Sequence, residues 1–188
     1  MAQADHCQPQ QGINAYDPRG AFVDFHNRPF RWAVMVCHRR AGKTVACVAD
    51  LVLSALITPK QDARFAYIAP QLNQAKDIAW AYLKNLTADI PQVQYNETEL
   101  RADLPNGARV RIYGADNPDR LRGLYLDGVI MDEYADMKPS VWGEIVRPLL
   151  SDRLGWAVFI GTPKGHNEFW RIWNTRKEDL EWFSLMLR

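Results

Sequence analysis

The sequence predicts an α/β fold in which a mostly parallel sheet is sandwiched by helices. Four short runs, at residues 32–36, 65–69, 128–131 and 156–160, are almost wholly apolar, as strands buried on both faces should be. Segments with helical spacing separate these runs, and strands that alternate with helices favour parallel pairing. Ligands of such sheets bind at the carboxyl ends of the strands.

The first half of the chain supplies two strand–helix units. Good helix formers follow the first strand and end at Thr58 and Pro59. Pro70 stops the second strand, after which apolar residues recur at helical spacing. We therefore expect helices over residues 43–56 and 71–87.

A hairpin is expected next. Residues 100–104 and 110–112 alternate between apolar and polar side chains, as half-buried strands do. Pro105, Asn106 and Gly107 lie between the two runs and are typical of a hairpin turn.

The second half adds two helices and a last strand. Pro139 is placed to begin a helix over residues 139–150, which Pro148 limits. Asn167 is a good cap for a helix over residues 167–177. The apolar residues 182–187 predict a further strand.

Composition excludes several classes of protein. The 188 residues carry 23 Lys and Arg against 22 Asp and Glu, a net charge of +1, which excludes a generally basic nucleic-acid binder but not a local basic patch. Three cysteines without a CxxC pair argue against a disulfide framework or a Cys-rich zinc site. The longest apolar run, residues 45–57, is interrupted by Asp50 and too short for a bilayer, so we expect no membrane partner.

Three segments are expected along the chain. Residues 1–20 are polar, rich in Gln and broken by Pro and Gly, which predicts a flexible N-terminal arm. The strand–helix alternation indicates a core over residues 21–165, followed by a C-terminal helix and strand over residues 166–188.

A phosphate-binding loop follows the first strand. The pattern GxxxxGK[ST] is matched except at its first position, where Cys37 replaces Gly and predicts a negative φ. Backbone N–H groups at the start of a helix cradle phosphate oxygens, Lys43 adds a positive charge, and the Thr44 hydroxyl can ligate Mg²⁺. The alternative is a chance GKT at a helix start. The expected phosphate-binding residues are Cys37, His38, Arg39, Arg40, Ala41, Gly42, Lys43 and Thr44.

Two carboxylates end the strand at residues 128–131. Asp132 fits a Mg²⁺ ligand, and Glu133 fits the base that orients and deprotonates an attacking water. The pair indicates hydrolysis; the alternative is a solvated acidic strand end. Thr162, at the end of another strand, could sense a γ-phosphate or position water, or belong to a plain strand–turn–helix connection.

Taken together, these blocks resemble the ATPase domain of the large terminase subunit of tailed bacteriophages, the family that powers packaging of double-stranded DNA into a preformed capsid. The more family-like features are the two arginines inside the phosphate loop and the Leu121-Arg122-Gly123 segment ahead of the acidic strand. The Gly-Thr-Pro-Lys-Gly motif at residues 161–165 is the third block, and the three blocks follow one another in the order found in this family. The resemblance covers roughly residues 22–175.

The resemblance implies a P-loop NTPase of the additional-strand, catalytic-glutamate (RecA-like) type, using ATP and Mg²⁺. The strand that carries Gly161 and Thr162 should lie near the P-loop strand. Lys43, Thr44 and the acidic pair match the family's phosphate, metal and catalytic residues, and Thr162 matches its coupling motif.

The resemblance leaves alternatives for which arginines act on the γ-phosphate and for which residues contact adenine. Arg39 or Arg40 could act on the γ-phosphate of the same subunit, or only neutralise phosphate. The family's motors work as rings in which one subunit can lend an arginine to its neighbour, and Arg122 is the first candidate here, ahead of Arg120, Arg147 and Arg153. The alternative for each of them is an ordinary surface or DNA-facing arginine. The family's adenine contact lies just upstream of the P-loop, where Phe30 and Arg28 could stack on the base; the alternative places Phe30 in the core.

The implied function is ATP hydrolysis that drives double-stranded viral DNA into a procapsid. The alternatives are another P-loop DNA translocase or helicase-like ATPase fragment, and a non-hydrolysing nucleotide-binding module, against which Glu133 argues. Expected partners are DNA, the portal protein, the small terminase subunit and further copies in a ring, in the host cytoplasm and transiently at the procapsid portal. The last segment would lead toward a nuclease domain absent here, so this chain alone should not cut DNA.

DNA contact should run mainly through phosphates, because a packaging motor must be indifferent to sequence. Arg101, Arg109 and Arg111 on the expected hairpin form a local basic cluster, which a solvated outer strand face would also explain.

Overall fold

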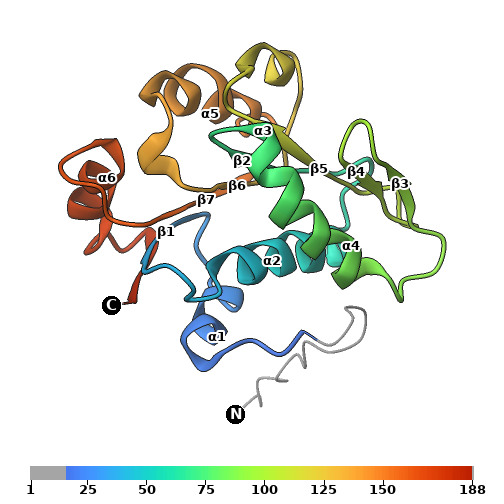
Figure 1. The fold of residues 1–188 in the computed structure, drawn as a ribbon, viewed down its shortest axis with the longest axis horizontal. Coiled ribbons are helices and arrows are strands. Elements are labelled where there is room, and N and C mark those ends of the chain that lie inside the picture. Colours follow the sequence, from blue (N-terminus) through green and yellow to red (C-terminus); the bar gives the residue numbers. More distant parts are fainter. Residues whose placement is uncertain (1–15, 188) are drawn as a thin grey trace.

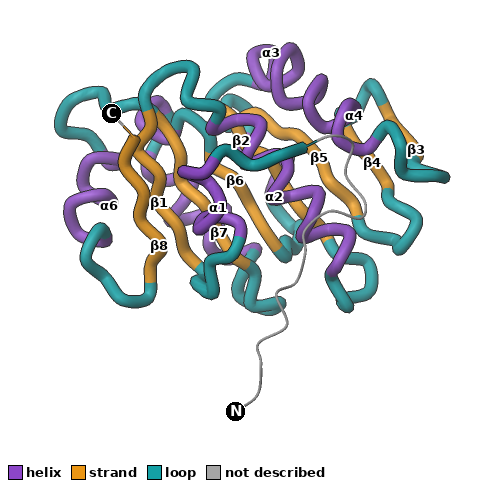
Figure 2. The backbone as a smooth tube through the Cα atoms, turned by 90° about the horizontal axis from the view of Figure 1, so that it is seen from below, coloured by secondary structure: helices purple, strands orange, loops and turns teal. Residues whose placement is uncertain are grey.

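A computed structural model describes residues 16–187 and contains, within that range, one eight-stranded sheet in the order β3-β4-β5-β2-β6-β7-β1-β8 (Figures 1 and 2). In this spatial order, all neighbouring strands between β5 and the edge strand β8 pair in parallel. At the other edge, β3 pairs with β4 and β4 pairs with β5 in antiparallel orientation. The strands are β1 Trp32–Cys37, β2 Arg64–Ala69, β3 Gln94–Asn96, β4 Arg101–Asp103, β5 Arg109–Gly114, β6 Gly128–Met131, β7 Trp156–Gly161 and β8 Trp182–Leu187.

Helices cover both faces, so the predicted sandwich is confirmed. The α-helices are α1 Gly20–His26, α2 Lys43–Ile57, α3 Leu72–Ala75, α4 Ala81–Thr87, α5 Arg147–Leu149 and α6 Glu168–Arg176. Two π-helical segments, η1 Lys76–Trp80 and η4 Val141–Val146, continue α3 into α4 and lead into α5. Short 3₁₀ turns, η2 Pro118–Leu121 and η3 Tyr134–Asp136, lie after β5 and β6.

The core is divided by the sheet into two apolar layers. One layer packs beneath α1, α2 and the α3–α4 helix, and the other beneath η4, α5 and α6 (Figure 1). Alternation along β2 shows the division, because Phe65 and Tyr67 enter the first layer whereas Ala66 and Ile68 enter the second. A sheet buried in this way needs the nearly unbroken apolar strands that the sequence displays.

Strand order brings three loops together. β7 lies between β6 and β1, with Val36 aligned to Gly161 and Met131 aligned to Phe159. The expectation that the strand carrying Gly161 lies beside the P-loop strand is therefore confirmed. Since these strands are parallel, the loops that follow their carboxyl ends meet at one edge of the sheet.

The expected hairpin is present, with β4 and β5 antiparallel and Gly107 at a φ of 84° in the turn between them. The sequence did not predict β3, whose three residues are exposed or half-exposed, nor α1.

Only residues 16–20 of the expected arm are described, because residues 1–15 lie outside the described residues. Most of this stretch is exposed, but Tyr16 packs against the core and its hydroxyl is 2.8 Å from His26 Nε2. The helix α1 begins at Gly20, and its Phe22 and Phe25, which fall within the expected core of residues 21–165, are buried. The division of the chain into three segments stays a prediction.

Among residues 16–187, no helix combines the length and apolar character needed to cross a membrane.

Candidate active site

The phosphate loop joins the end of β1 to the start of α2. Cys37 is the buried last residue of β1, and its φ is not positive, as predicted. Positive φ occurs instead at Arg40, 65°, and Gly42, 91°, which turn the chain before Lys43 begins the helix. The non-glycine residue in a left-handed conformation stores strain, which is common in loops built to bind a ligand.

The side chains of this loop divide into inward and outward groups. Ala41 and Lys43 are buried, whereas His38, Arg39 and Arg40 are exposed. His38 Nδ1 lies 2.6 Å from the Arg39 carbonyl oxygen, which bridges the loop locally. The two arginines therefore offer positive charge at the mouth of the loop.

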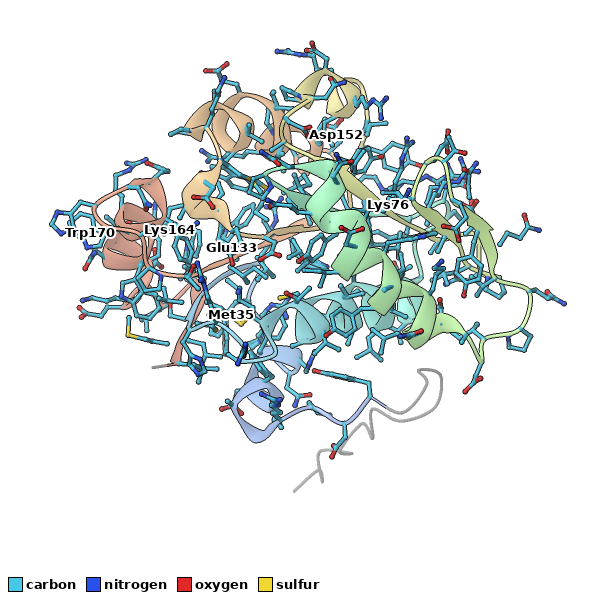
Figure 3. All side chains as sticks on the ribbon, in the orientation of Figure 1. Met35, Lys76, Glu133, Asp152, Lys164 and Trp170 are labelled. Carbon is cyan, nitrogen blue, oxygen red and sulfur yellow. The ribbon has the colours of Figure 1, made fainter. Side chains whose placement is uncertain are left out.

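Glu133, which is labelled in Figure 3, links its own loop to the two other loops at this edge. Its Oε1 lies 3.0 Å from Lys43 Nζ of the P-loop. Its Oε2 accepts a hydrogen bond of 3.1 Å from the Thr162 hydroxyl and a longer one of 3.4 Å from the Thr162 backbone N–H. The fold thus brings together the predicted lysine, catalytic carboxylate and third-loop threonine from separate parts of the sequence.

The backbone conformation of Glu133 directs its side chain toward Lys43 and Thr162. Its φ and ψ are both 45°, a left-handed conformation at the end of β6. The Glu133 N–H donates to Asp132 Oδ1 at 2.8 Å, so the two adjacent acids are held in different directions. Strain at a non-glycine residue in the centre of a site is consistent with a conformation selected for chemistry.

Asp132 is half-buried beneath the site and receives a hydrogen bond from the Tyr67 hydroxyl of β2. Burial raises the pKa of Asp132 above its ordinary value, the Glu133 carboxylate acts in the same direction, and Tyr67 and Lys43 oppose the rise. Burial and Asp132 also raise the pKa of Tyr67, and Thr44 opposes that rise. The three residues therefore form one group beside the P-loop.

This group fits a magnesium ion. A hydroxyl and a carboxylate are hard oxygen ligands of the kind that Mg²⁺ takes, usually together with water and phosphate oxygens. A half-buried carboxylate whose pKa is raised, such as that of Asp132, would also be stabilised in its ionised form by a cation. In the part of the chain that is described, no cluster of three or more His, Cys, Asp or Glu residues forms an all-protein metal site.

Arg28, expected beside Phe30 as a contact for adenine, pairs with a buried acid. Arg28 donates to both carboxylate oxygens of buried Asp50, at 3.0 and 2.7 Å, and its guanidinium lies over Phe25 and Trp156. Its side chain is only 6% exposed, so stacking on a base would require it to leave Asp50, and the adenine contact stays a prediction. Phe30 is half-buried.

Arg122 is exposed and lies apart from these contacts. Its Nε donates to Asp119 at 2.9 Å, and its side chain is 64% exposed. It borders an open hollow of about 340 Å³ together with residues that include Lys138 and Glu144. Such exposure leaves it able to reach another molecule.

Two residues near the site were not assigned to it from the sequence. Tyr67 belongs to the strand expected over residues 65–69, for which the sequence predicts no role in the site, yet its hydroxyl binds Asp132. A tyrosine inside a buried strand needs a partner for its hydroxyl, which is the signal that could have indicated this contact. Arg19 was placed in the flexible arm, yet its Nη1 donates to the Ala41 carbonyl of the P-loop at 2.9 Å.

Comparison with known proteins agrees with this geometry. Residues 35–183 match the family model described as terminase large subunit, T4likevirus-type, N-terminal. The large terminase subunit of Thermus phage G20c is 33% identical over 176 residues, which cover 84% of this chain and 36% of that protein. That of Escherichia phage T5 is 27% identical over 165 residues, covering 85% and 37%. The chain thus spans about a third of the length of these relatives.

Solved structures show the same fold. The ATPase domain of the large terminase of Thermus phage P74-26 superposes with a TM-score of 0.78 at 27% identity, over 92% of this chain and 81% of that one. The large terminase of a thermophilic bacteriophage, solved in complex with ADP, gives a TM-score of 0.70 at 19% identity, over 84% and 40%. With the P-loop, acidic pair and third-loop threonine assembled at one sheet edge, the chain belongs to the terminase large subunit family, of which it is the N-terminal domain with the P-loop ATPase fold.

Proposed function

We propose that this domain hydrolyses ATP and that hydrolysis drives double-stranded DNA into a viral procapsid. The observation that carries the proposal is that the Glu133 carboxylate contacts both Lys43 Nζ, at 3.0 Å, and the Thr162 hydroxyl, at 3.1 Å. The large terminase of a thermophilic bacteriophage was solved with ADP, and family membership favours a packaging motor over another translocase or a helicase fragment.

The contacts suggest how the chemistry proceeds. A triphosphate carries more negative charge than one carboxylate, so bound ATP draws Lys43 away from Glu133. Glu133 loses its cationic partner and becomes the base that orients and deprotonates the attacking water. Thr162 continues to hold one carboxylate oxygen, which keeps the base directed at the γ-phosphate and links its state to the third loop.

Thr44 and Asp132 would hold Mg²⁺, which when bound supplies neutralising charge at the β- and γ-phosphates. Tyr67 keeps the Asp132 carboxylate in place through its hydroxyl. Arg39 and Arg40 supply further positive charge from the exposed side of the loop.

The proposal is tested by phosphate release at increasing protein concentration, with and without double-stranded DNA. We expect turnover per chain to rise steeply with concentration, because a ring would share residues between neighbouring sites. Lys43→Ala is the control that abolishes phosphate binding in the loop. Absence of ATP hydrolysis under every condition would refute the proposal.

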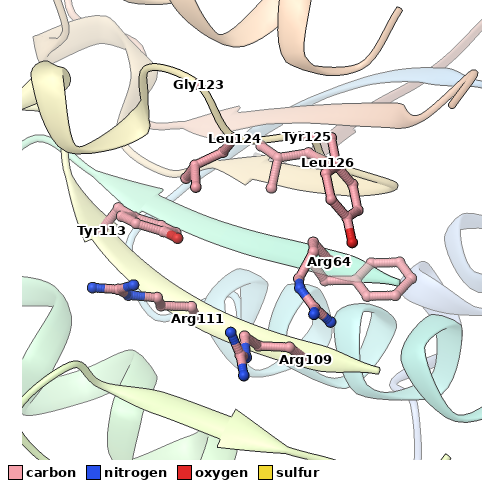
Figure 4. A pocket seen from close by; sticks show the side chains of 9 residues that line it. Arg64, Arg109, Arg111, Tyr113, Gly123, Leu124, Tyr125 and Leu126 are labelled. Carbon is pink, nitrogen blue, oxygen red and sulfur yellow. The ribbon is translucent and has the colours of Figure 1, made fainter. Parts of the chain in front are cut away.

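For DNA contact we propose the arginine face, defined as Arg64, Arg101, Arg109 and Arg111 on one side of β2, β4 and β5. Three of its members, Arg64, Arg109 and Arg111, line a shallow hollow of about 140 Å³ (Figure 4). Opposite side chains of the same strands, such as Val110 and Ile112, are buried in the core. Alternation along the strands therefore places the basic side chains on a face of their own.

Carboxylates already pair with this face. Asp103 bridges Arg101 and Arg109, whereas Glu99 lies 3.9 Å from Arg111 Nη1. Phosphates would have to compete with these acids, and Arg111 has the longest ion pair among them. A long ion pair that phosphate can replace, such as that of Arg111, suits a motor that must release DNA after each step.

Arg111→Ala tests this surface. We expect affinity for random-sequence DNA to fall about threefold and the slope of log affinity against log salt to decrease by about one. Arg171→Ala, which removes an exposed arginine paired with Glu168, is the matched control and should change neither. Identical salt slopes for Arg111→Ala and the unmodified chain would contradict the assignment.

The remaining partners follow from the same proposal. We propose a homo-oligomeric ring in which Arg122 reaches a neighbouring site, a portal protein and a small terminase subunit as further partners, and a location in the host cytoplasm with transient binding at the procapsid portal. The exposure of Arg122 supports the first of these.

A further inference from the structure

Arg19 lies against the backbone of the phosphate loop. Its Nη1 donates to the Ala41 carbonyl oxygen at 2.9 Å. A Cβ atom added to Gly42 would stand 3.5 Å from the same nitrogen, so the guanidinium also covers the glycine that precedes Lys43. One side chain from outside the motif therefore hydrogen-bonds Ala41 and lies beside Gly42.

The contacted part of the loop is the part that needs support. Arg40 and Gly42 flank Ala41, and both have positive φ. A non-glycine residue in this conformation is strained and persists only when surrounding structure holds it. Phosphate binding depends on the direction of the backbone N–H groups in this turn, so a restraint on the Ala41 peptide bears directly on the cradle.

The segment that carries Arg19, residues 16–28, is fixed to the helix that follows the loop. Asp50, in α2, accepts from Arg28 at 2.7 Å and lies 3.2 Å from His26 Nδ1. The Tyr16 hydroxyl extends this network at 2.8 Å from His26 Nε2. The segment is thus anchored on one part of α2 and contacts the loop at its start.

We propose that Arg19 is a positioning residue for ATP: it holds the Ala41 peptide so that the P-loop keeps its phosphate-binding conformation. The proposal rests on the proposed ATPase function. Because Arg19 acts through the loop, its removal weakens binding of any triphosphate, with or without a base. A residue that stacked on adenine would instead affect ATP alone.

The test compares Arg19→Ala and Arg19→Lys with the unmodified chain. Affinities for ATP and for inorganic triphosphate are measured by competition with a fluorescent ATP analogue, together with KM and kcat. For Arg19→Ala we expect both affinities to fall, and KM to rise, about threefold to tenfold, the change that one hydrogen bond contributes, while kcat stays within about twofold. Arg19→Lys, which keeps a cationic donor, should recover most of the loss, and Arg171→Ala should behave as the unmodified chain.

Several results would overturn the proposal. Unchanged affinities in Arg19→Ala would show that the contact is incidental, and a loss confined to ATP would make Arg19 a base contact. If Arg19→Ala does not fold, the Arg19→Lys variant tests the proposal instead. If its affinities for ATP and inorganic triphosphate are as weak as those of the Lys43→Ala control, a single cationic donor at this position is not enough to hold the loop, and the proposal is rejected. Affinity for inorganic triphosphate does not require hydrolysis, so an unmodified chain that binds but does not turn over ATP would defeat the proposed function and leave this comparison valid.

Discussion

Replacing Asp50 by asparagine should destabilise the domain by about 3 kcal/mol. The Asp50 carboxylate is 7% exposed and receives two hydrogen bonds from Arg28, whose side chain is 6% exposed. The asparagine side chain has nearly the same shape but no charge, so it leaves the Arg28 guanidinium buried without its counter-ion. Breaking a buried pair from one side costs about 3–5 kcal/mol, because the remaining charge is still desolvated.

Urea unfolding followed by tryptophan fluorescence measures this loss. With a slope of about 2–3 kcal/mol per molar urea for a domain of this size, the midpoint should fall by about 1 M or more. Adding Arg28→Met to Asp50→Asn should recover part of the loss, since the unpaired cation is then removed as well.

A matched control separates burial from pairing. Asp179→Asn breaks the ion pair with Arg176, whose side chain is 47% exposed, and should cost less than about 1 kcal/mol. If Asp50→Asn were destabilised no more than this control, the reasoning that the buried Arg28–Asp50 pair anchors residues 16–28 would be refuted.

Three further predictions concern pH, a thiol and the assembled ring. Burial alone would raise the pKa of Asp50, but Arg28 and His26 together hold it below its ordinary value of 3.8 in the folded chain. The contribution of the ionised Asp50 to stability is therefore present above that value and is lost as pH falls through the lowered pKa. Between pH 5 and 2, the urea midpoint should accordingly fall less in Asp50→Asn than in the unmodified chain. Burial raises the pKa of Cys37 to about 11, so its thiol should resist iodoacetamide at pH 8 until the protein is unfolded, and rapid native labelling would be the contrary result. If Arg122 acts on a neighbouring subunit, mixing inactive Arg122→Ala and Glu133→Gln chains should restore measurable ATP hydrolysis. A mixture that remains as inactive as either variant alone would exclude a shared site.

The buried parallel strands and the motif order could be predicted from sequence because each depends on a local pattern. Buried parallel strands require unbroken apolar runs, and the P-loop sequence combines a fixed spacing with a fixed local geometry. The helix α1 was missed because it has seven residues in a segment rich in Pro and Gly, and its signal, Phe22 and Phe25, is too short to establish a period.

Contacts between distant residues were the part that the sequence could not supply. Tyr67 and Asp132 are separated by 65 positions, and Arg19 and Ala41 by 22. Neither pair follows from a local pattern, because each depends on strand order and on how one segment folds over another. The same limit applies to Arg28, whose partner Asp50 lies on the next helix.

The central claim is that Glu133 is the catalytic base of an ATP-hydrolysing site, and the most direct test compares Glu133→Gln with the unmodified chain. Phosphate release and equilibrium binding of ATP are measured on the same preparations. We expect turnover to fall at least about 100-fold, the contribution typical of a general base, while ATP binds as tightly as before or more tightly because Lys43 has lost its competing carboxylate. Hydrolysis by Glu133→Gln at the rate of the unmodified chain would contradict the account.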